Sequence, residues 1–249
     1  MKDDLPIKYY QDLMTAKGRK EHSAFIIEGV RQVEQFSLSK NVKLLEILTT
    51  EPLKFETKTP VRYISNSQLC KITESKTPNG VIAIAEIPRR GGRGRSPATT
   101  NDNILLLEDI QDPGNVGALI RSAAAFGFSA VILSQNCADV YSPKVVRASG
   151  GAICNLEIIN KTDIFECIEE LKRQNYKLIV ADLDGKNEIQ SRSKKIIYAL
   201  GNEGNGISEK LHSIADEIFT IPFDNSAVES LNVAAAGAIG MFMINNVGA

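Results

Sequence analysis

The stretch LLLEDIQDPGNVGALIRSAAAFGF, residues 105–128, sets the pattern of the C-terminal part of the chain. Its first apolar run fits a strand that ends at the turn sequence Asp112-Pro113-Gly114. Asn115 follows at a position suited to start a helix, which Gly127 closes. The next apolar run, SAVILS, predicts a second strand. A strand, a helix and a second strand in this order predict a parallel sheet.

The same alternation continues to the end of the chain. Further strands are expected at CNLEII, KLIVAD, IIYAL and EIFTIP, and helices at SPKVVRAS, DIFECIEELKRQN and SLNVAAAGAIGMFMI. Pro143 is expected at a first helical position after Ser142, and Asp163 is spaced to cap the next helix. Ligands of open parallel sheets bind beyond the carboxyl ends of the strands, so we expect the functional site there.

A smaller α/β domain is predicted before this part. The pattern of FIIEGVRQVEQFS predicts the end of a strand followed by a helix. Strands are also predicted at LLEILTT, VRYIS and GVIAIAEI, the last of them central in its sheet. PRRGGRGRSPATTN, residues 88–101, has linker composition. It either serves only as a tether or also brings its arginines to phosphates. The predicted division is 1–87, a linker at 88–103, and 104–249.

Composition excludes several classes of protein. The 249 residues carry a formal net charge of −1, so any nucleic-acid contact must come from local basic patches. Four scattered cysteines and two histidines favour neither a zinc site nor a disulfide framework, and they fit a cytoplasmic protein. The N-terminus lacks the apolar core of a signal peptide. VAAAGAIGMFMI is too short to span a bilayer and predicts a buried helix.

Two later stretches carry unusual polar residues. GNEGNGIS, residues 201–208, follows a strand and has the glycines of a phosphate cradle, although other ligands also need close backbone approach. In IPFDNSAVESLNV, residues 221–233, Ser230 is either a helix cap or a functional residue. Asn232 is expected in the first turn of an apolar helix, where its side chain needs a partner. A Rossmann fingerprint is rejected, because DPGNVGALI supplies only G-x-x-G.

Together these stretches resemble the three motifs of the SpoU (TrmH) family of S-adenosylmethionine-dependent RNA ribose 2′-O-methyltransferases, in the SPOUT superfamily. The motifs are N-x-G-x-x-x-R after D-P, then L-G-N-E-G-x-G, then E-S-L-N-V. YSPKVVRASGGA, residues 141–152, is similar to the segment between the first two. KGRKEHSAFIIEGVRQVE and TPNGVIAIAEIP resemble the family's N-terminal substrate-binding domain, so the resemblance covers nearly the whole chain.

The resemblance implies a C-terminal α/β domain with a deep trefoil knot, whose loops form the cofactor pocket. S-adenosylmethionine would be held by groups around Leu200, Gly201, Gly204, Ile221 and Leu231. The glycines allow close backbone approach, and the apolar residues can line an adenine ring.

The resemblance also implies which residues act in methyl transfer to a ribose 2′-hydroxyl. Arg121 matches the catalytic arginine; because its pKa is above about 12, phosphate binding and alkoxide stabilisation suit it better than proton removal. The other matching residues are Asn115, Glu203, Ser230 and Asn232. The asparagines would orient the arginine and the ribose, and Glu203 would fix the loop or the arginine.

RNA is the partner that the resemblance implies, with ribosomal RNA favoured over transfer RNA. The candidate phosphate contacts are Lys144, Arg147, Arg89 and Arg93. The resemblance further implies a homodimer, and the final helix with Met241, Phe242 and Met243 either forms that interface or is buried. Composition and the short apolar stretch predict neither a metal nor a membrane as partner. A protein that binds RNA without catalysis is the alternative. One departure is visible: the loop around Asn225 lacks an expected glycine and is a residue longer.

Overall fold

The computed structural model describes residues 5–39, 41–75, 78, 80–88, 102–191, 193 and 195–246. Contacts divide it into two units. The first holds the described residues of Met1–Arg89 together with Asp139–Asn155, and the second holds those of Arg90–Ala138 and Leu156–Ala249. This division differs from the predicted boundary, since the 139–155 segment joins the N-terminal unit. Residues 89–101 of the predicted linker lie outside the described part.

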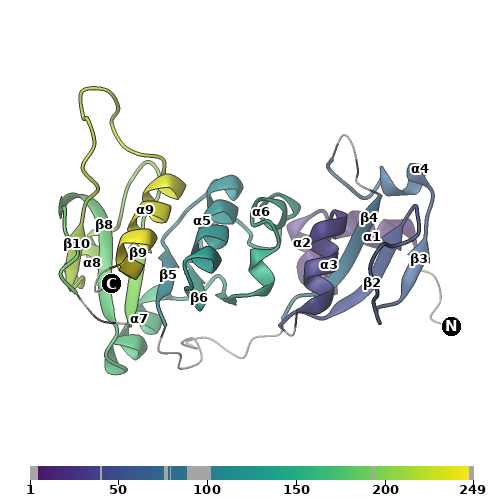
Figure 1. Cartoon of the computed structure of the whole chain (residues 1–249), viewed down its shortest axis with the longest axis horizontal. Helices are drawn as coiled ribbons and strands as arrows, with labels where there is room; N and C mark the ends of the chain where they lie inside the picture. Colours follow the sequence, from purple (N-terminus) through teal and green to yellow (C-terminus); the bar gives the residue numbers. More distant parts are fainter. Residues whose placement is uncertain are drawn as a thin grey trace. The chain divides into compact units, whose positions relative to one another are not determined.

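A four-stranded sheet forms the centre of the first unit (Figure 1), in the order β1-β4-β2-β3. Its strands are β1 (Ala24–Glu28), β2 (Leu44–Thr49), β3 (Val61–Tyr63) and β4 (Val81–Glu86). β4 pairs with both β1 and β2, which confirms its predicted central position. The helices are α1 (Ile7–Asp12), α2 (Ala16–His22), α3 (Val30–Leu38) and α4 (Asn66–Leu69). The sequence predicted α3 but not α1, α2 or α4.

The 139–155 segment packs on β1 through helix α6 (Pro143–Ala148). Pro143 stands at the first helical position after Ser142, whose side chain accepts a hydrogen bond from the backbone NH of Val145, as predicted. The ring of Tyr141 lies 4.9 Å from that of Phe25 on β1. This packing is the physical reason that the segment belongs to the first unit.

The second unit contains a six-stranded sheet in the order β10-β8-β9-β5-β6-β7 (Figure 1), and every neighbouring pair is parallel. The predicted parallel sheet is confirmed. The strands are β5 (Ile104–Leu107), β6 (Ala130–Leu133), β7 (Glu157–Ile159), β8 (Lys177–Lys186), β9 (Ile196–Leu200) and β10 (Glu217–Phe219). The helices are α5 (Pro113–Ala125), α7 (Ile164–Arg173), α8 (Glu209–Ser213) and α9 (Val233–Asn246), with the short 3-10 turn η1 (Ala152–Cys154) belonging to the first unit.

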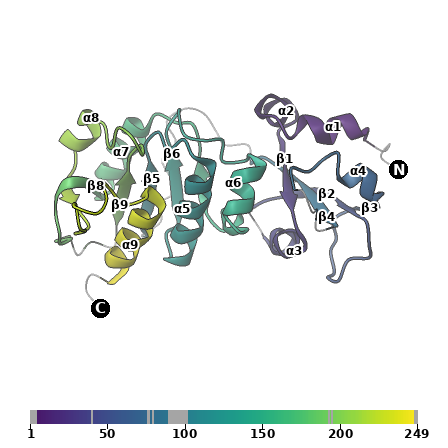
Figure 2. The ribbon, with the colours of Figure 1, turned by 90° about the horizontal axis from the view of Figure 1, so that it is seen from above.

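Alternate side chains of β9 serve opposite faces of this sheet. Ile197 and Ala199 join the core that includes the apolar residues of α7 and α8. On the other face, a Cβ at Gly240 of α9 would lie 2.1 Å from the hydroxyl of Tyr198, so α9 lies directly on β9. Figure 2 shows α5 and α9 side by side, in agreement with the close contact between them. Within the described residues, no helix is both long and apolar enough to cross a bilayer.

The sequence predicted the N-terminal cap of α7 correctly but not that of α5. Asp163 caps α7 by accepting a hydrogen bond from Phe165 NH at 2.9 Å, as predicted. The start of α5 was predicted wrongly, because Asp112 is the cap rather than Asn115. Asp112 Oδ1 accepts from Asn115 NH at 2.9 Å and Pro113 occupies the first helical position. The side chain of Asn115 is therefore left available for other contacts.

Candidate functional site

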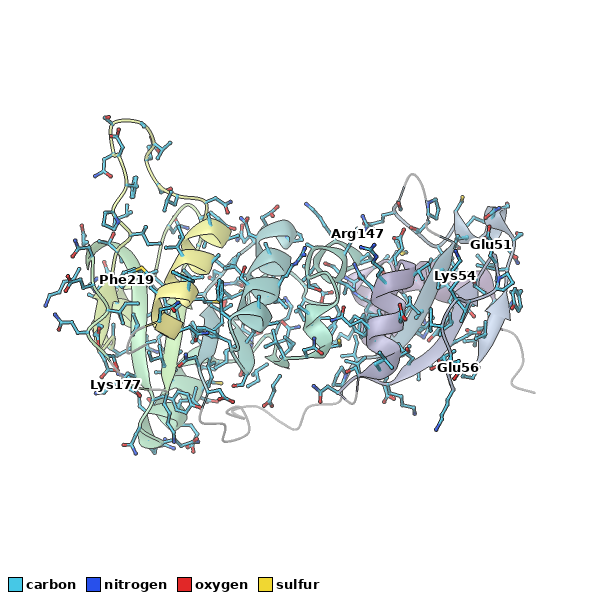
Figure 3. All side chains as sticks on the ribbon, in the orientation of Figure 1. Glu51, Lys54, Glu56, Arg147, Lys177 and Phe219 are labelled. Atoms are coloured by element: carbon cyan, nitrogen blue, oxygen red, sulfur yellow. The ribbon has the colours of Figure 1, made fainter. Side chains whose placement is uncertain are left out.

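A pocket of about 670 Å³ lies where the sheet meets the loop after β9 and the loop before α9. Small-molecule sites span roughly 300–1,000 Å³. All five residues predicted to bind the cofactor line it, namely Leu200, Gly201, Gly204, Ile221 and Leu231. Phe219, labelled in Figure 3, ends β10 and adds a buried aromatic wall. The pocket lies beyond the carboxyl ends of β9 and β10, at the edge of the sheet where the sequence predicts a site.

Asn202 builds the glycine loop that forms one wall. Its Oδ1 accepts hydrogen bonds from the NH groups of Gly204 and Asn205 at 2.9 and 3.0 Å. Its Nδ2 donates to the carbonyl of Asp109 at 2.8 Å, which ties the loop to the end of β5. The sequence reading missed Asn202, although an Asn inside a glycine turn signals a side chain that bonds nearby backbone.

The glycines of this loop have different roles. A Cβ at Gly201 would lie 2.3 Å from the carbonyl carbon of Gly206, so Gly201 is needed for the loop to close on itself. Gly206 has a φ of +68°, a conformation that glycine adopts readily. A Cβ at Gly204 would meet only Asn202 Oδ1, at 3.5 Å. Gly204 therefore has open side-chain space beside the pocket, as does Gly206, where a Cβ would meet nothing within 4 Å.

Glu108 anchors the far end of the same loop. It is 8% exposed, and its carboxylate accepts hydrogen bonds from the NH and the hydroxyl of Ser208 at 2.8 and 2.7 Å. Ser208 in turn caps α8. The sequence reading missed Glu108 as well, because its partner lies 100 residues away.

Three of the predicted catalytic residues form one hydrogen-bonded chain. Asn232 Nδ2 donates to Asn115 Oδ1 at 3.1 Å, and Asn115 Nδ2 donates to Glu203 Oε1 at 2.9 Å. Asn232 Oδ1 accepts from the NH groups of Ala234 and Ala235 at 3.0 and 3.3 Å. Because Asn232 Oδ1 already accepts from NH groups of α9, Asn232 presents its Nδ2 to Asn115. The start of α9 therefore sets which atom donates at each step of these hydrogen bonds.

These contacts also decide between two interpretations of the start of α9. Asn232 is the capping residue, so it stands just before the helix rather than in its first turn as expected. Ser230, the other candidate cap, lies on the pocket wall instead. Ser230 is therefore a lining residue of the pocket and not the cap of α9.

The loop before α9 replaces the expected glycine with a hydrogen-bonded turn. Asp224 Oδ1 accepts from the NH and the hydroxyl of Ser226 at 2.9 and 2.6 Å, and the Asp224 carbonyl accepts from Ala227 NH at 3.1 Å. These hydrogen bonds, chiefly the one from the Ser226 hydroxyl, lower the pKa of Asp224 below its ordinary value. The turn forms around Asp224 without needing a glycine.

Arg121 stands apart from the hydrogen-bonded chain. It is exposed on α5, six residues after Asn115, which corresponds to a rise of about 9 Å along a helix. Within the part of the chain that the structure describes, its guanidinium makes no hydrogen bond or ion pair. The cation is thus presented to solvent.

The predicted phosphate contacts belong to the first unit or lie outside the described residues. Lys144 and Arg147 are exposed on α6, and Figure 3 labels Arg147 there. Arg147 forms an ion pair with Glu28 at 3.2 Å. Arg89 and Arg93 lie outside the described part of the chain.

The described residues that line the pocket include three acids, Asp182, Glu203 and Glu229, and neither Lys, Arg nor His. In the same described ranges, no group of His, Cys, Asp and Glu is arranged to hold a metal ion. The apolar and aromatic wall, the open space at Gly204 and the carboxylates suit a ligand with an uncharged ring and a positive charge.

Comparison with known proteins agrees with this fold. Residues 102–242 match the SpoU rRNA Methylase family, and residues 5–83 match the MRM3-like substrate binding domain. The chain belongs to the SpoU rRNA methylase family. It is an RNA ribose 2′-O-methyltransferase.

Relatives and solved structures match nearly the whole chain. The 23S rRNA (guanosine(2553)-2′-O)-methyltransferase RlmP of Bacillus subtilis is 30% identical, covering 94% of this chain and 93% of the relative. A TrmH-family structure from Porphyromonas gingivalis is 29% identical, with a TM-score of 0.82 and 96% of each chain covered. AviRb from Streptomyces viridochromogenes, solved in complex with AdoMet, shares the fold at 23% identity with a TM-score of 0.84 and 97% of each chain covered.

Proposed function

We propose that this chain methylates a ribose 2′-hydroxyl of 23S ribosomal RNA in the cytoplasm, with S-adenosylmethionine as the methyl donor. The observation that carries the proposal is the series of hydrogen bonds from Asn232 through Asn115 to Glu203 beside the pocket. It joins all three motifs in one place. RlmP, which is named for a 23S rRNA ribose, supports the choice of RNA because its similarity spans both parts of this chain.

The pocket residues fit the cofactor. Ile221 and Leu231 offer apolar surface to the adenine ring, and the open space at Gly204 allows a ligand to approach the backbone. Gly201 and Leu200 complete that side of the wall. When bound, S-adenosylmethionine supplies a methyl group on a positively charged sulfur.

The protein residues have distinct proposed roles in the transfer. Bound S-adenosylmethionine would supply the methyl group to the ribose 2′-oxygen, and the hydroxyl proton would pass to solvent water. The pocket wall, as far as it is described, contains no histidine to take that proton. We assign Arg121 to binding the RNA phosphate and stabilising negative charge on the 2′-oxygen. Asn115, Asn232 and Ser230 orient the ribose, and Glu203 positions Asn115.

The N-terminal unit is proposed to select the RNA. Lys144 and Arg147 on α6 would contact phosphates, with Arg89 and Arg93 adding to them. Phosphate would then compete with Glu28 for the Arg147 guanidinium. The proposal also keeps residues 1–87 as the substrate-binding domain and 104–249 as the methyltransferase domain, since the two matched families begin and end near those limits.

A knotted homodimer is the proposed assembly. The C-terminal segment would thread through the loops around the pocket, as the family resemblance implies. Met241 is fully buried, whereas Ile239 and Phe242 of the same helix are 40% and 55% exposed. This exposed apolar side is a candidate for the interface. Light scattering after size exclusion tests it, and a clean monomer would count against the dimer.

The decisive experiment is methylation of total RNA with labelled cofactor, followed by mapping of the 2′-O-methyl position. The expected result is one labelled ribose in 23S rRNA. Label in transfer RNA alone would overturn the choice of substrate. An Arg121→Lys enzyme should lose most of the incorporation, because a point charge cannot replace the bidentate guanidinium. No incorporation into any RNA by the unaltered enzyme would favour an RNA-binding protein without catalysis.

A further inference from the structure

The pocket wall carries negative charge that the proposed roles in methyl transfer do not require. Asp182 is half-buried on β8, and Glu229 is exposed in the loop before α9. Glu203 is the third acid, and one of its oxygens is occupied by Asn115. The described lining residues carry no positive side chain to neutralise these three. The pocket is therefore a negatively charged cavity in a protein whose overall net charge is only −1.

We propose that Asp182 and Glu229 make this pocket selective for the positively charged methyl donor over its product, S-adenosylhomocysteine. The inference rests on the proposed function. S-adenosylmethionine carries a sulfonium, an ammonium and a carboxylate, so its net charge is +1. Loss of the methyl group leaves a neutral sulfur and a net charge of zero. The two ligands have the same adenosine and the same amino-acid end, so apolar burial does not distinguish them.

The wall carboxylates lie close enough to a bound ligand, and are screened little enough, for their charge to affect its affinity. In a cavity of about 670 Å³, a wall charge lies within about one Debye length, roughly 8 Å at physiological ionic strength, of a ligand inside. Screening is weaker for half-buried charges than for exposed ones. Asp182 should therefore contribute more than Glu229. Among the described residues, the Asp182 carboxylate accepts one long hydrogen bond, at 3.3 Å from Asp184 NH to Oδ1, so it keeps capacity for a ligand.

The same charge disfavours phosphate inside the cavity. An RNA backbone phosphate placed among three carboxylates would be repelled, whereas phosphate near the exposed Arg121 would be attracted. The cavity thus admits the methyl donor and keeps the nucleic-acid backbone outside. After transfer, the attraction for the sulfur is lost, so the product dissociates more readily than the donor.

Binding calorimetry on the full-length protein tests the proposal without RNA or turnover. The ligands are S-adenosylmethionine, S-adenosylhomocysteine and sinefungin, in which an amine carries the positive charge in place of the sulfonium. Asp182→Asn should reduce the preference for S-adenosylmethionine over S-adenosylhomocysteine by about tenfold, and Glu229→Gln by about threefold. The affinity for S-adenosylhomocysteine should change little. Sinefungin should follow S-adenosylmethionine, and added salt should reduce the preference of the unaltered protein.

Glu169→Gln is the control, because Glu169 is an exposed acid on α7 that does not line the pocket. It should leave the preference unchanged. An unchanged preference in Asp182→Asn, or an equal loss for both cofactor forms, overturns the inference while leaving the proposed function intact. Failure of the unaltered protein to bind S-adenosylmethionine at all would instead overturn the proposed function itself.

Discussion

Asn115 and Glu203 stand 88 residues apart in the chain and are joined by a 2.9 Å hydrogen bond from Asn115 Nδ2 to Glu203 Oε1. The bond connects the first turn of α5 to the glycine loop after β9. Because Asn115 Oδ1 already accepts from Asn232, the amide of Asn115 cannot rotate without losing both partners. The two side chains therefore act as one unit that sets the position of Asn232 at the pocket.

A double-mutant cycle on this pair tests that coupling. Asn115→Ala and Glu203→Ala should each lower the single-turnover methylation rate by about 10- to 100-fold, since each breaks the same chain. The double variant should be little slower than the worse single variant, which corresponds to a coupling energy of about 1.4 kcal/mol or more. Rates are measured with saturating cofactor, and calorimetry checks that cofactor affinity is kept. Effects that simply multiply would show that the two residues act separately.

The two pocket glycines should respond differently to substitution. Gly201→Ala places a methyl group 2.3 Å from the Gly206 backbone, so the loop must open and both thermal stability and cofactor binding should fall. Gly204→Val adds its side chain toward open space, so the protein should keep its melting temperature and its RNA affinity while losing cofactor binding. Thermal denaturation, calorimetry and a filter-binding assay with RNA measure the three properties. Equal loss of stability in both variants would contradict these roles.

The sequence predicted the C-terminal sheet well, because its strands contain short apolar runs and helices with clear start residues lie between most of them. It could not predict which unit residues 139–155 join. That depends on side chains meeting across long separations, such as Asp139 with Arg19, 120 residues apart. The roles of Asn202 and Glu108 could not be predicted for the same reason, because each bonds to a partner far away in the sequence. The motifs did bring Asn115, Glu203 and Asn232 to notice, since a polar residue among apolar ones signals a required partner.

Asp216 should make the second unit sensitive to acid. Burial alone would raise the pKa of its carboxyl, but a hydrogen bond from Leu178 NH at 2.8 Å and the nearby Lys172 and Lys177 ammonium groups outweigh it, so the pKa is lowered. A lowered folded-state pKa contributes stability above the unfolded-state value, and this contribution is lost as pH falls through the folded-state value.

The unaltered protein should therefore have a higher free energy of unfolding than Asp216→Asn. The difference should be largest near pH 7. The difference should shrink below about pH 4, where an unfolded Asp takes up its proton. Urea titrations at a series of pH values measure both proteins. A difference that stays constant between pH 7 and pH 3 would show that the charge of Asp216 contributes nothing.

Arg19 should be the residue on which the attachment of the 139–155 segment depends most. Its side chain is only 5% exposed, and its Nε and Nη2 donate to Asp139 Oδ2 at 3.0 and 2.6 Å. Its Nη1 donates to the carbonyls of Leu13 and Met14, both at 2.9 Å. Arg19→Ala should lower the free energy of unfolding of the first unit by about 3 kcal/mol, because it leaves these acceptors without a donor.

Asp139→Asn should cost less, because Asp139 is a quarter exposed and water can replace part of its interaction, while Arg19 keeps its two carbonyl partners. Hydrogen exchange in the 139–155 segment separates a local effect from a global one: faster exchange should appear there first. Arg31→Ala, an exposed arginine on α3 of the same unit, is the control and should change little. If Arg19→Ala leaves exchange in the segment unchanged, the ion pair does not hold it in place.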